Sequence, residues 1–179
     1  WHQDLHYWGL DAKDEVTAWL ALSPASIESG CMRFIPASHM KEVAHEARPA
    51  EGAMLSRGQE LVEPVDESQA VNAALLPGQI SLHHGLAFHG SLPNRSDDRR
   101  IGFAIRYIRP SMRQAGGETG VATLVQGRDL HHHFELAPRP ASVATPESIA
   151  VWQHAVGIQK KINFRDMKTP MDGEGALRT

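Results

Sequence analysis

Short runs in which apolar and polar residues alternate, each bounded by Pro, Gly, Asn or Asp, recur along the first two thirds of the chain. Runs of this kind are typical of β-strands between turns. We predict strands over residues 15–22, 30–35, 70–76, 79–84 and 100–108. The pattern therefore indicates a mainly β protein.

The strand predicted over residues 100–108 has a strict period of two. One face carries large apolar side chains, namely Ile101, Phe103, Ile105 and Tyr107. The other face carries small residues and the two arginines Arg100 and Arg106. Because alternate residues of a strand point to opposite sides of a sheet, we predict that the apolar face packs in the core and that the other face is polar.

Residues 40–67 mix Glu, Arg, Gly and Pro without a sustained period. We interpret them as a long surface excursion between strands, and long excursions are often lids. The last residues, 169–179, are polar and rich in glycine, so we expect a flexible tail there.

A helical period appears only near the C-terminus. Thr145 is a candidate N-cap, and Pro146 suits the first helical position. Apolar residues follow at helical spacings, at Ile149, Trp152, Val156 and Ile162. We predict one amphipathic helix that covers the sheet.

Composition narrows the class of protein. The chain has 179 residues, about one domain's length, with 18 Lys+Arg against 21 Asp+Glu and a formal net charge of -3. This balance gives no reason to expect a nucleic-acid partner. No run approaches the roughly 18 apolar residues of a membrane span. The single cysteine, Cys31, has no internal partner, which fits a reducing compartment. We expect one cytoplasmic domain without a membrane partner.

Two segments carry candidate metal ligands. His2 and Asp4 are two positions apart, so on an extended chain both side chains project to one side. Taken alone, this pair is more readily a surface histidine near a surface aspartate until a third ligand is found. The second segment holds three histidines within seven residues, His83, His84 and His89. Any one of them is as readily a packed polar residue as a ligand.

Arg100 lies 11 residues after His89, on the strand face without large apolar residues. Its guanidinium can pair bidentately with a carboxylate in a cavity, and the alternative is a surface ion pair with Asp97 or Asp98. Two histidines and one carboxylate on a metal leave positions open, as in non-haem Fe(II) oxygenases. A 2-oxo acid cosubstrate would chelate the iron and place its distal carboxylate on an arginine.

The same residues resemble the phytanoyl-CoA dioxygenase family of Fe(II)- and 2-oxoglutarate-dependent oxygenases. Three stretches carry the resemblance: WHQDLHYW at residues 1–8, SGCMRFIPASH at residues 29–39, and HGSLPNRS at residues 89–96 with Arg100 after it. Their order and spacing agree with the family over about residues 1–110. Ala37 stands where the family usually has glycine.

This resemblance implies a jelly roll, the double-stranded β-helix, with helices outside. It implies that His2, Asp4 and His89 bind Fe(II), and that Arg100 holds the distal carboxylate of 2-oxoglutarate. Ser91 and Trp19 are expected to shape that pocket. The family carries further elements upstream of its first metal ligand, so we expect the chain to be the C-terminal portion of one oxygenase domain.

Other residues have weaker claims. His6, Tyr7 and Trp8 follow the first metal segment and are as readily packing residues as parts of a substrate mouth. Met32 and Arg106 are candidates for the cavity wall. The alternative for Met32 is core filling, and the alternative for Arg106 is a surface charge. The tract His131–His133 lies in a Pro-flanked loop without a carboxylate placed for it, and Cys31 is expected to be a buried small residue.

The leading hypothesis is a dioxygenase that uses Fe(II), 2-oxoglutarate and O2 to hydroxylate a small organic substrate, with release of succinate and CO2. Halogenation is disfavoured because Asp4 occupies the position that a halide ligand needs. Two other classes stay open, a non-catalytic jelly-roll binding module and a cupin-like divalent-metal hydrolase or isomerase. The substrate, the oligomeric state, the metal bound and the activity of this portion alone do not follow from the sequence.

Overall fold

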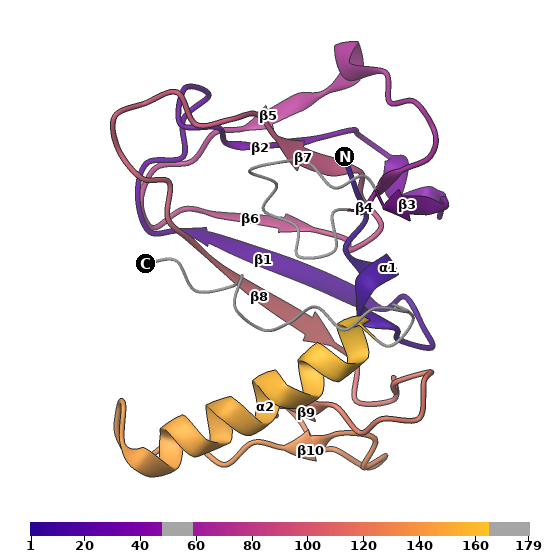
Figure 1. Cartoon of the computed structure of the whole chain (residues 1–179), viewed down its shortest axis with the longest axis vertical. Coiled ribbons are helices and arrows are strands. Elements are labelled where there is room, and N and C mark those ends of the chain that lie inside the picture. The colour runs from indigo at the N-terminus through magenta and orange to yellow at the C-terminus, as the bar shows by residue number, and fades with distance from the viewer. Residues whose placement is uncertain (48–58, 165–179) are drawn as a thin grey trace.

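The computed structural model describes residues 1–47 and 59–164 (Figure 1). Two three-stranded antiparallel sheets form its centre. The first has the order β6-β1-β8 and is built from β1 (Glu15–Ala21), β6 (Ile80–His83) and β8 (Gly102–Ile108). The second has the order β5-β2-β7 and is built from β2 (Met32–Phe34), β5 (Val71–Ala73) and β7 (His89–Ser91). All five predicted strands are therefore present, each shorter than predicted.

The two sheets meet through aromatic side chains. Phe34 of β2 lies 4.8 Å, centroid to centroid, from the ring of His83 on β6. In Figure 1 the β5-β2-β7 sheet lies above the β6-β1-β8 sheet, and the N-terminal segment runs down between them to α1 (Leu5–Trp8). The space between the sheets is the place where side chains from distant parts of the sequence meet.

Cross-strand register decides which residues of β6, β1 and β8 share a face. Thr17 is opposite His83 on one side and Arg106 on the other. Trp19 is likewise opposite Ser81 and Ala104. These residues point between the sheets, and their neighbours in sequence point outward.

The apolar face of β8 points outward, which corrects the prediction that it packs in the core. Phe103 is 56% exposed, and Leu82 on the neighbouring β6 is 70% exposed. Alternation alone defines two faces but not which one is inward, and here the inward face carries Arg106, Ala104 and Gly102. The buried apolar side chains of the described residues lie elsewhere, at Leu5, Ala18, Ala21, Ala25, Cys31, Met32, Val43, Leu61, Leu86, Met112 and Ile162.

The C-terminal helix is present as α2 (Pro146–Phe164). The Thr145 hydroxyl accepts a hydrogen bond from the Ser148 backbone N–H at 3.2 Å, so Thr145 is the N-cap. The helix packs on α1 and β9, which corrects the prediction that it covers the central sheet. Trp152 on its surface is 58% exposed.

Several short elements were not predicted. β3 (His45–Ala47) pairs with β4 (Gln59–Leu61), and β9 (Val121–Ala122) pairs in parallel with β10 (Glu135–Leu136). Two 3-10 turns span Ser38–Met40 and Glu67–Gln69. The predicted excursion over residues 40–67 thus contains a two-strand ribbon, and its lid role remains a prediction.

The predicted tail over residues 169–179 lies outside the described residues. Among the residues that the structure describes, no helix is long and apolar enough to cross a membrane.

Candidate functional site

His2, Asp4 and His89 come together between the sheets. The Nε2 atom of His2 lies 3.4 Å from Asp4 Oδ1, and the Nε2 atom of His89 lies 3.7 Å from the same oxygen. One ligand atom from each residue falls within 4.8 Å of the others. Over residues 1–47 and 59–164, this is the group of three side chains able to hold a metal ion.

A backbone bridge brings these residues together across 87 positions of sequence. The His2 N–H donates to the His89 carbonyl at 3.0 Å, and the His89 N–H donates to the His2 carbonyl at 3.1 Å. Asp4 follows as the N-cap residue of α1, and the Leu5 N–H donates to the Gly85 carbonyl at 3.1 Å. The N-terminal segment therefore pairs like a strand beside β7 and then turns into α1.

The electrostatics of this group suit a cation. Burial lowers the pKa of His89 to about 3, so its imidazole is neutral near pH 7. Its Nδ1 lies 2.9 Å from the Ala87 carbonyl, which only accepts hydrogen bonds, so Nδ1 carries the proton and Nε2 keeps its lone pair. That lone pair faces Asp4, and two buried acceptors so close favour a cation between them.

Asp4 is held ionised. Burial alone would raise its pKa, but the hydrogen bond from His2 and the positive charges around the carboxylate, including that of Arg106, lower the pKa to about 2. A carboxylate that stays deprotonated across neutral pH is the form that binds a divalent metal.

Gln3, between the two N-terminal ligand candidates, holds their segment in place. It is fully buried. Its amide nitrogen donates to the carbonyls of Lys41 and Leu86, each at 2.7 Å, and its amide oxygen accepts from the Val43 N–H at 3.0 Å. The Gln3 N–H donates to His45 Nε2 at 3.0 Å. Gln3 was not among the predicted functional residues, although alternation along an extended segment places its side chain opposite those of His2 and Asp4.

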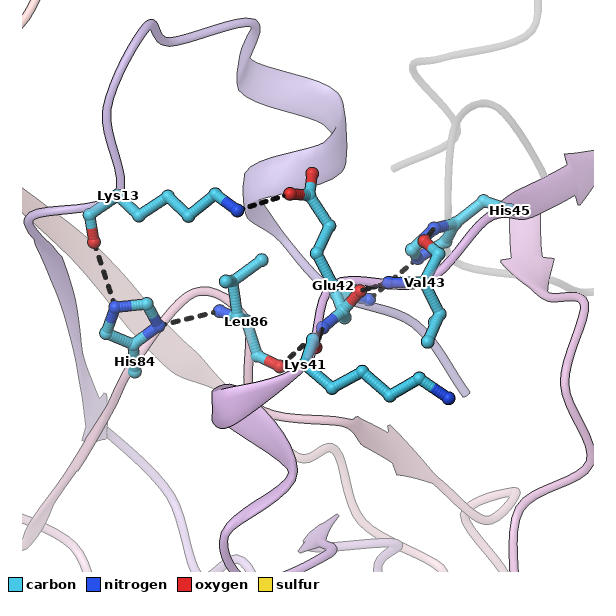
Figure 2. Close-up of polar contacts among 8 residues, drawn as sticks. Lys13, Lys41, Glu42, Val43, His45, His84 and Leu86 are labelled. Atoms are coloured by element: carbon cyan, nitrogen blue, oxygen red, sulfur yellow. Dashed lines mark hydrogen bonds and ion pairs between the residues drawn. The ribbon is translucent and has the colours of Figure 1, made fainter.

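Figure 2 shows polar contacts of Lys41, Val43 and Leu86, whose backbone groups bind the Gln3 amide. His84 Nε2 donates to the Lys13 carbonyl at 2.9 Å, and His84 Nδ1 accepts from the Leu86 N–H at 3.0 Å. The Lys13 ammonium pairs with Glu42. His84, a rival of His89 in the sequence, is therefore a structural residue of the turn after β6.

Arg100, Trp19 and Gly102 form a second cluster. The Cζ atom of Arg100 lies 5.5 Å from the Trp19 ring centroid. A Cβ at Gly102 would overlap the Trp19 indole, so only glycine allows this ring to lie against β8. Arg100 makes no ion pair with a described carboxylate, including Asp97 and Asp98, and its Nη1 is buried without a hydrogen-bond partner in the described structure. Burial lowers the pKa of Arg100 below its usual value.

Further polar atoms on the inward face of β6-β1-β8 lack partners among the described residues. They are Glu15 Oε2, Ser81 Oγ and His83 Nδ1. His83, the other rival of His89, lies 5.3 Å from the His89 ring, centroid to centroid, beside the metal-binding group but outside it. Buried polar atoms without protein partners can be satisfied by a polar ligand or by water.

Ser91 lies on β7 opposite Met32 of β2 and is exposed. Met32 is 9% exposed. The role of Ser91 in a cosubstrate pocket remains a prediction.

Trp8 is covered by Arg106, whose Cζ lies 4.8 Å from the indole centroid. The ring of His6 stacks on that of His45, with centroids 4.1 Å apart.

The remaining candidates have local structural contacts. The backbone N–H groups of His131 and His132 donate to the Asp129 carboxylate, and His133 Nδ1 donates to the Met112 carbonyl at 3.2 Å. Cys31 is 2% exposed and lies directly before β2.

Residues 1–102, which include His2, Asp4, His89 and Arg100, match the phytanoyl-CoA dioxygenase (PhyH) family. The chain belongs to this family. The "Phytanoyl-CoA dioxygenase domain-containing protein 1 homolog" of Caenorhabditis elegans is 30% identical over 113 residues, which are 60% of this chain and 39% of that protein. The related protein of Bos taurus is 34% identical over 110 residues, 60% of this chain and 38% of its own length.

Solved structures agree with the fold. ThoJ, a non-heme monooxygenase, superimposes with a TM-score of 0.80 at 34% identity over 92% of this chain and 60% of ThoJ. EvdO2 from Micromonospora carbonacea var. aurantiaca, solved with 2-oxoglutarate, has a TM-score of 0.51 at 28% identity over 59% of this chain and 43% of EvdO2. The predicted fold class, a mainly β jelly roll with a helix near the C-terminus, is confirmed. The chain spans about two fifths of the length of the curated relatives.

Proposed function

We propose that this chain carries the catalytic centre of a dioxygenase that uses Fe(II), 2-oxoglutarate and O2 to hydroxylate a small organic substrate. The observation that supports this most directly is the convergence of His2, Asp4 and His89 on one point. Two imidazoles and one carboxylate form the ligand set of non-haem Fe(II) oxygenases. When bound there, the iron supplies oxygen activation coupled to oxidative decarboxylation of the 2-oxo acid.

The protein's own part in this scheme is to hold the ligands. His2 and Asp4 extend from a segment that Gln3 fixes through four hydrogen bonds. His89 is oriented by its Nδ1–H donated to the Ala87 carbonyl. Ligands oriented by such outer contacts bind a metal without rearrangement.

Arg100 is proposed to bind the distal carboxylate of 2-oxoglutarate. Its buried Nη1 has no partner among the described residues, so a carboxylate there satisfies a donor that otherwise lacks a bond. Trp19 supports the guanidinium by stacking, and Ser91 is proposed to line the same pocket. Hydroxylation is favoured over halogenation because the carboxylate ligand, Asp4, is present.

The test is anaerobic titration with Fe(II) and 2-oxoglutarate, monitored by visible absorption. A charge-transfer band from the chelated complex is expected. Asp4→Ala is expected to abolish it by removing a metal ligand. Arg100→Gln is expected to raise the 2-oxoglutarate concentration needed for half-saturation by about tenfold or more while iron affinity stays near that of the native chain.

Arg113→Gln is the matched control, because Arg113 pairs with Asp11 on the surface. A folded chain that binds Fe(II) but shows no band with 2-oxoglutarate would indicate a binding module instead. Stable zinc binding that supports hydrolysis would indicate the metal hydrolase. Equal losses of iron and 2-oxoglutarate binding in Arg100→Gln would remove Arg100 from the cosubstrate pocket.

A further inference from the structure

Among the described residues, three arginines stack on tryptophans. The distances from the guanidinium Cζ to the ring centroid are 5.2 Å for Arg33 on Trp1, 5.5 Å for Arg100 on Trp19 and 4.8 Å for Arg106 on Trp8. Stacking occupies a flat face of the guanidinium and leaves its in-plane N–H groups free to bind an oxyanion. The three pairs therefore differ in what meets those N–H groups.

Arg33 already has its partner, since its Nη1 donates to Glu67 Oε2 at 2.8 Å. Arg100 is accounted for by the proposed cosubstrate pocket. Arg106 forms no ion pair with any carboxylate in residues 1–47 and 59–164, and its side chain is exposed. Of the three stacked arginines, it is the one with neither an ion pair among the described residues nor an assigned role.

Arg106 lies at the metal end of the inward face. It is opposite Thr17 in the β1–β8 register, and His83 is opposite Thr17 on the other side. The His83 ring lies 5.3 Å, centroid to centroid, from the His89 ring, so this end of the inward face lies beside the metal-binding group. Trp8, which supports it, follows Asp4 by four residues at the end of α1.

The position of Arg106 differs from that of Arg100 in one functional respect. Arg100 is largely shielded from solvent and stacks on Trp19, whereas Arg106 is exposed at the other end of the same strand face. A solvent-accessible cation next to the metal-binding group can receive a molecule that arrives after the cosubstrate is bound. A planar guanidinium held on an indole selects a carboxylate or a phosphate, which it binds bidentately.

We infer that Arg106 binds the anionic group of the substrate, so that the substrate of this site is an organic anion bearing a carboxylate or a phosphate. The inference rests on the proposed function and specifies its substrate class. It assigns Trp8 as the residue that positions the guanidinium.

The test uses the chain loaded with saturating 2-oxoglutarate and with Mn(II) in place of Fe(II). Mn(II) supports no turnover. Hexanoate and hexanamide, a matched acid and neutral amide, serve as probes, and Mn(II) broadens the proton NMR signals of a molecule that binds near it. Hexanoate is expected to be broadened at a concentration about tenfold lower than hexanamide. Arg106→Gln is expected to remove this difference, and Arg106→Lys to keep part of it.

Arg109→Gln is the matched control, because Arg109 lies three residues further along and pairs with Asp14 on the surface. It is expected to behave as the native chain does. Failure of the native chain to broaden hexanoate, or equal broadening of both probes, would overturn the inference. So would an Arg106→Gln chain that loses 2-oxoglutarate affinity as strongly as Arg100→Gln, since Arg106 would then serve the cosubstrate.

The anaerobic Fe(II) and 2-oxoglutarate band separates the two proposals. If the native chain lacks the band, the proposed function fails. If the band is present in both the native chain and Arg106→Gln but the acid and the amide bind alike, only the substrate inference fails.

Discussion

Glu15 is a buried carboxyl group near the metal-binding group. It is 6% exposed, and its Oε1 accepts a hydrogen bond from the Thr17 hydroxyl at 2.8 Å. Burial is the main cause that raises its pKa to about 7, and the charge of Asp4 raises it further. Near neutral pH this side chain therefore lies between its two protonation states.

Glu15→Gln tests this shift through stability. The unfolded chain releases the Glu15 proton near pH 4.5 and the folded chain near 7. Between these values the folded state holds more protons, so its stability falls as pH rises. We expect the native chain and Glu15→Gln to have similar unfolding free energies at pH 4.5. The variant should become progressively the more stable of the two up to about pH 8.

Urea unfolding of both metal-free chains across this pH range measures the difference. All other titrating groups are common to both chains, so their contributions cancel. A difference that stays constant with pH would show that the Glu15 pKa is not raised.

Candidate site residues were predictable where the residues that define them lie close together in the sequence. His2 and Asp4 were recognisable from their spacing of two, and the choice of His89 over His83 and His84 came from the family resemblance. The burial of Glu15 was not predictable, because it depends on the turn at Gly85, 70 positions away. A Cβ at Gly85 would overlap the Glu15 carboxylate and Leu5.

At the scale of elements, β1 and β8 are joined by a backbone ladder and by the packing of Trp19 on Gly102. The pair makes a continuous antiparallel ladder from Glu15 opposite Ile108 to Ala21 opposite Gly102. Trp19 lies over Gly102 and under Arg100. The backbone of β8 at Gly102 therefore supports the stack of Trp19 and Arg100.

Gly102→Ala is expected to destabilise the chain by about 1–3 kcal/mol, because its Cβ would overlap the Trp19 indole and force the ring to move. Displacement of Trp19 should also remove the support of Arg100. The 2-oxoglutarate affinity should therefore fall together with the unfolding free energy, and urea unfolding and the absorption titration measure the two effects.

Gly157→Ala is the control for this change. Gly157 lies inside α2, and a Cβ there would meet no atom within 4 Å. Alanine in a helix interior is expected to add about 0.5–1 kcal/mol of stability without effect on 2-oxoglutarate. If both variants behave alike, the Trp19 contact does not hold the pocket.

The longest elements had the clearest sequence patterns. β1 and β8, seven residues each, give a clear alternation, and α2 has both a cap and a helical period. β9 and β10 have two residues each, too few for any period. β7 has three, and its strand character comes from pairing with β2 rather than from its own sequence.

Over the whole molecule, the β6-β1-β8 sheet separates two kinds of surface. The inward face holds Arg100, Arg106 and the residues around the metal-binding group. The outward face holds large apolar side chains that are substantially exposed in the described structure, among them Ile80, Leu82, Phe103 and Tyr107. The sequence defined both faces correctly but could not decide their orientation, since that depends on which face meets the second sheet.

This orientation predicts that substitutions on the outward face of the sheet change dye binding but not the binding of Fe(II) and 2-oxoglutarate. A contiguous exposed apolar face binds hydrophobic dyes, so the native chain is expected to enhance the fluorescence of anilinonaphthalene sulfonate. Leu82→Lys and Phe103→Lys should each reduce this enhancement, because both side chains are more than half exposed on the outward face. Neither should change the Fe(II) and 2-oxoglutarate absorption band.

Leu130→Lys is the control, because Leu130 is 78% exposed but lies in a loop away from this sheet. It should leave both signals unchanged, which would assign the dye signal to the sheet face rather than to exposed apolar residues in general. If Phe103→Lys instead abolished the absorption band while Leu82→Lys did not, residue 103 would face the cavity. The register of β8 would then differ by one residue, and Arg100 and Arg106 would both point away from the metal-binding group.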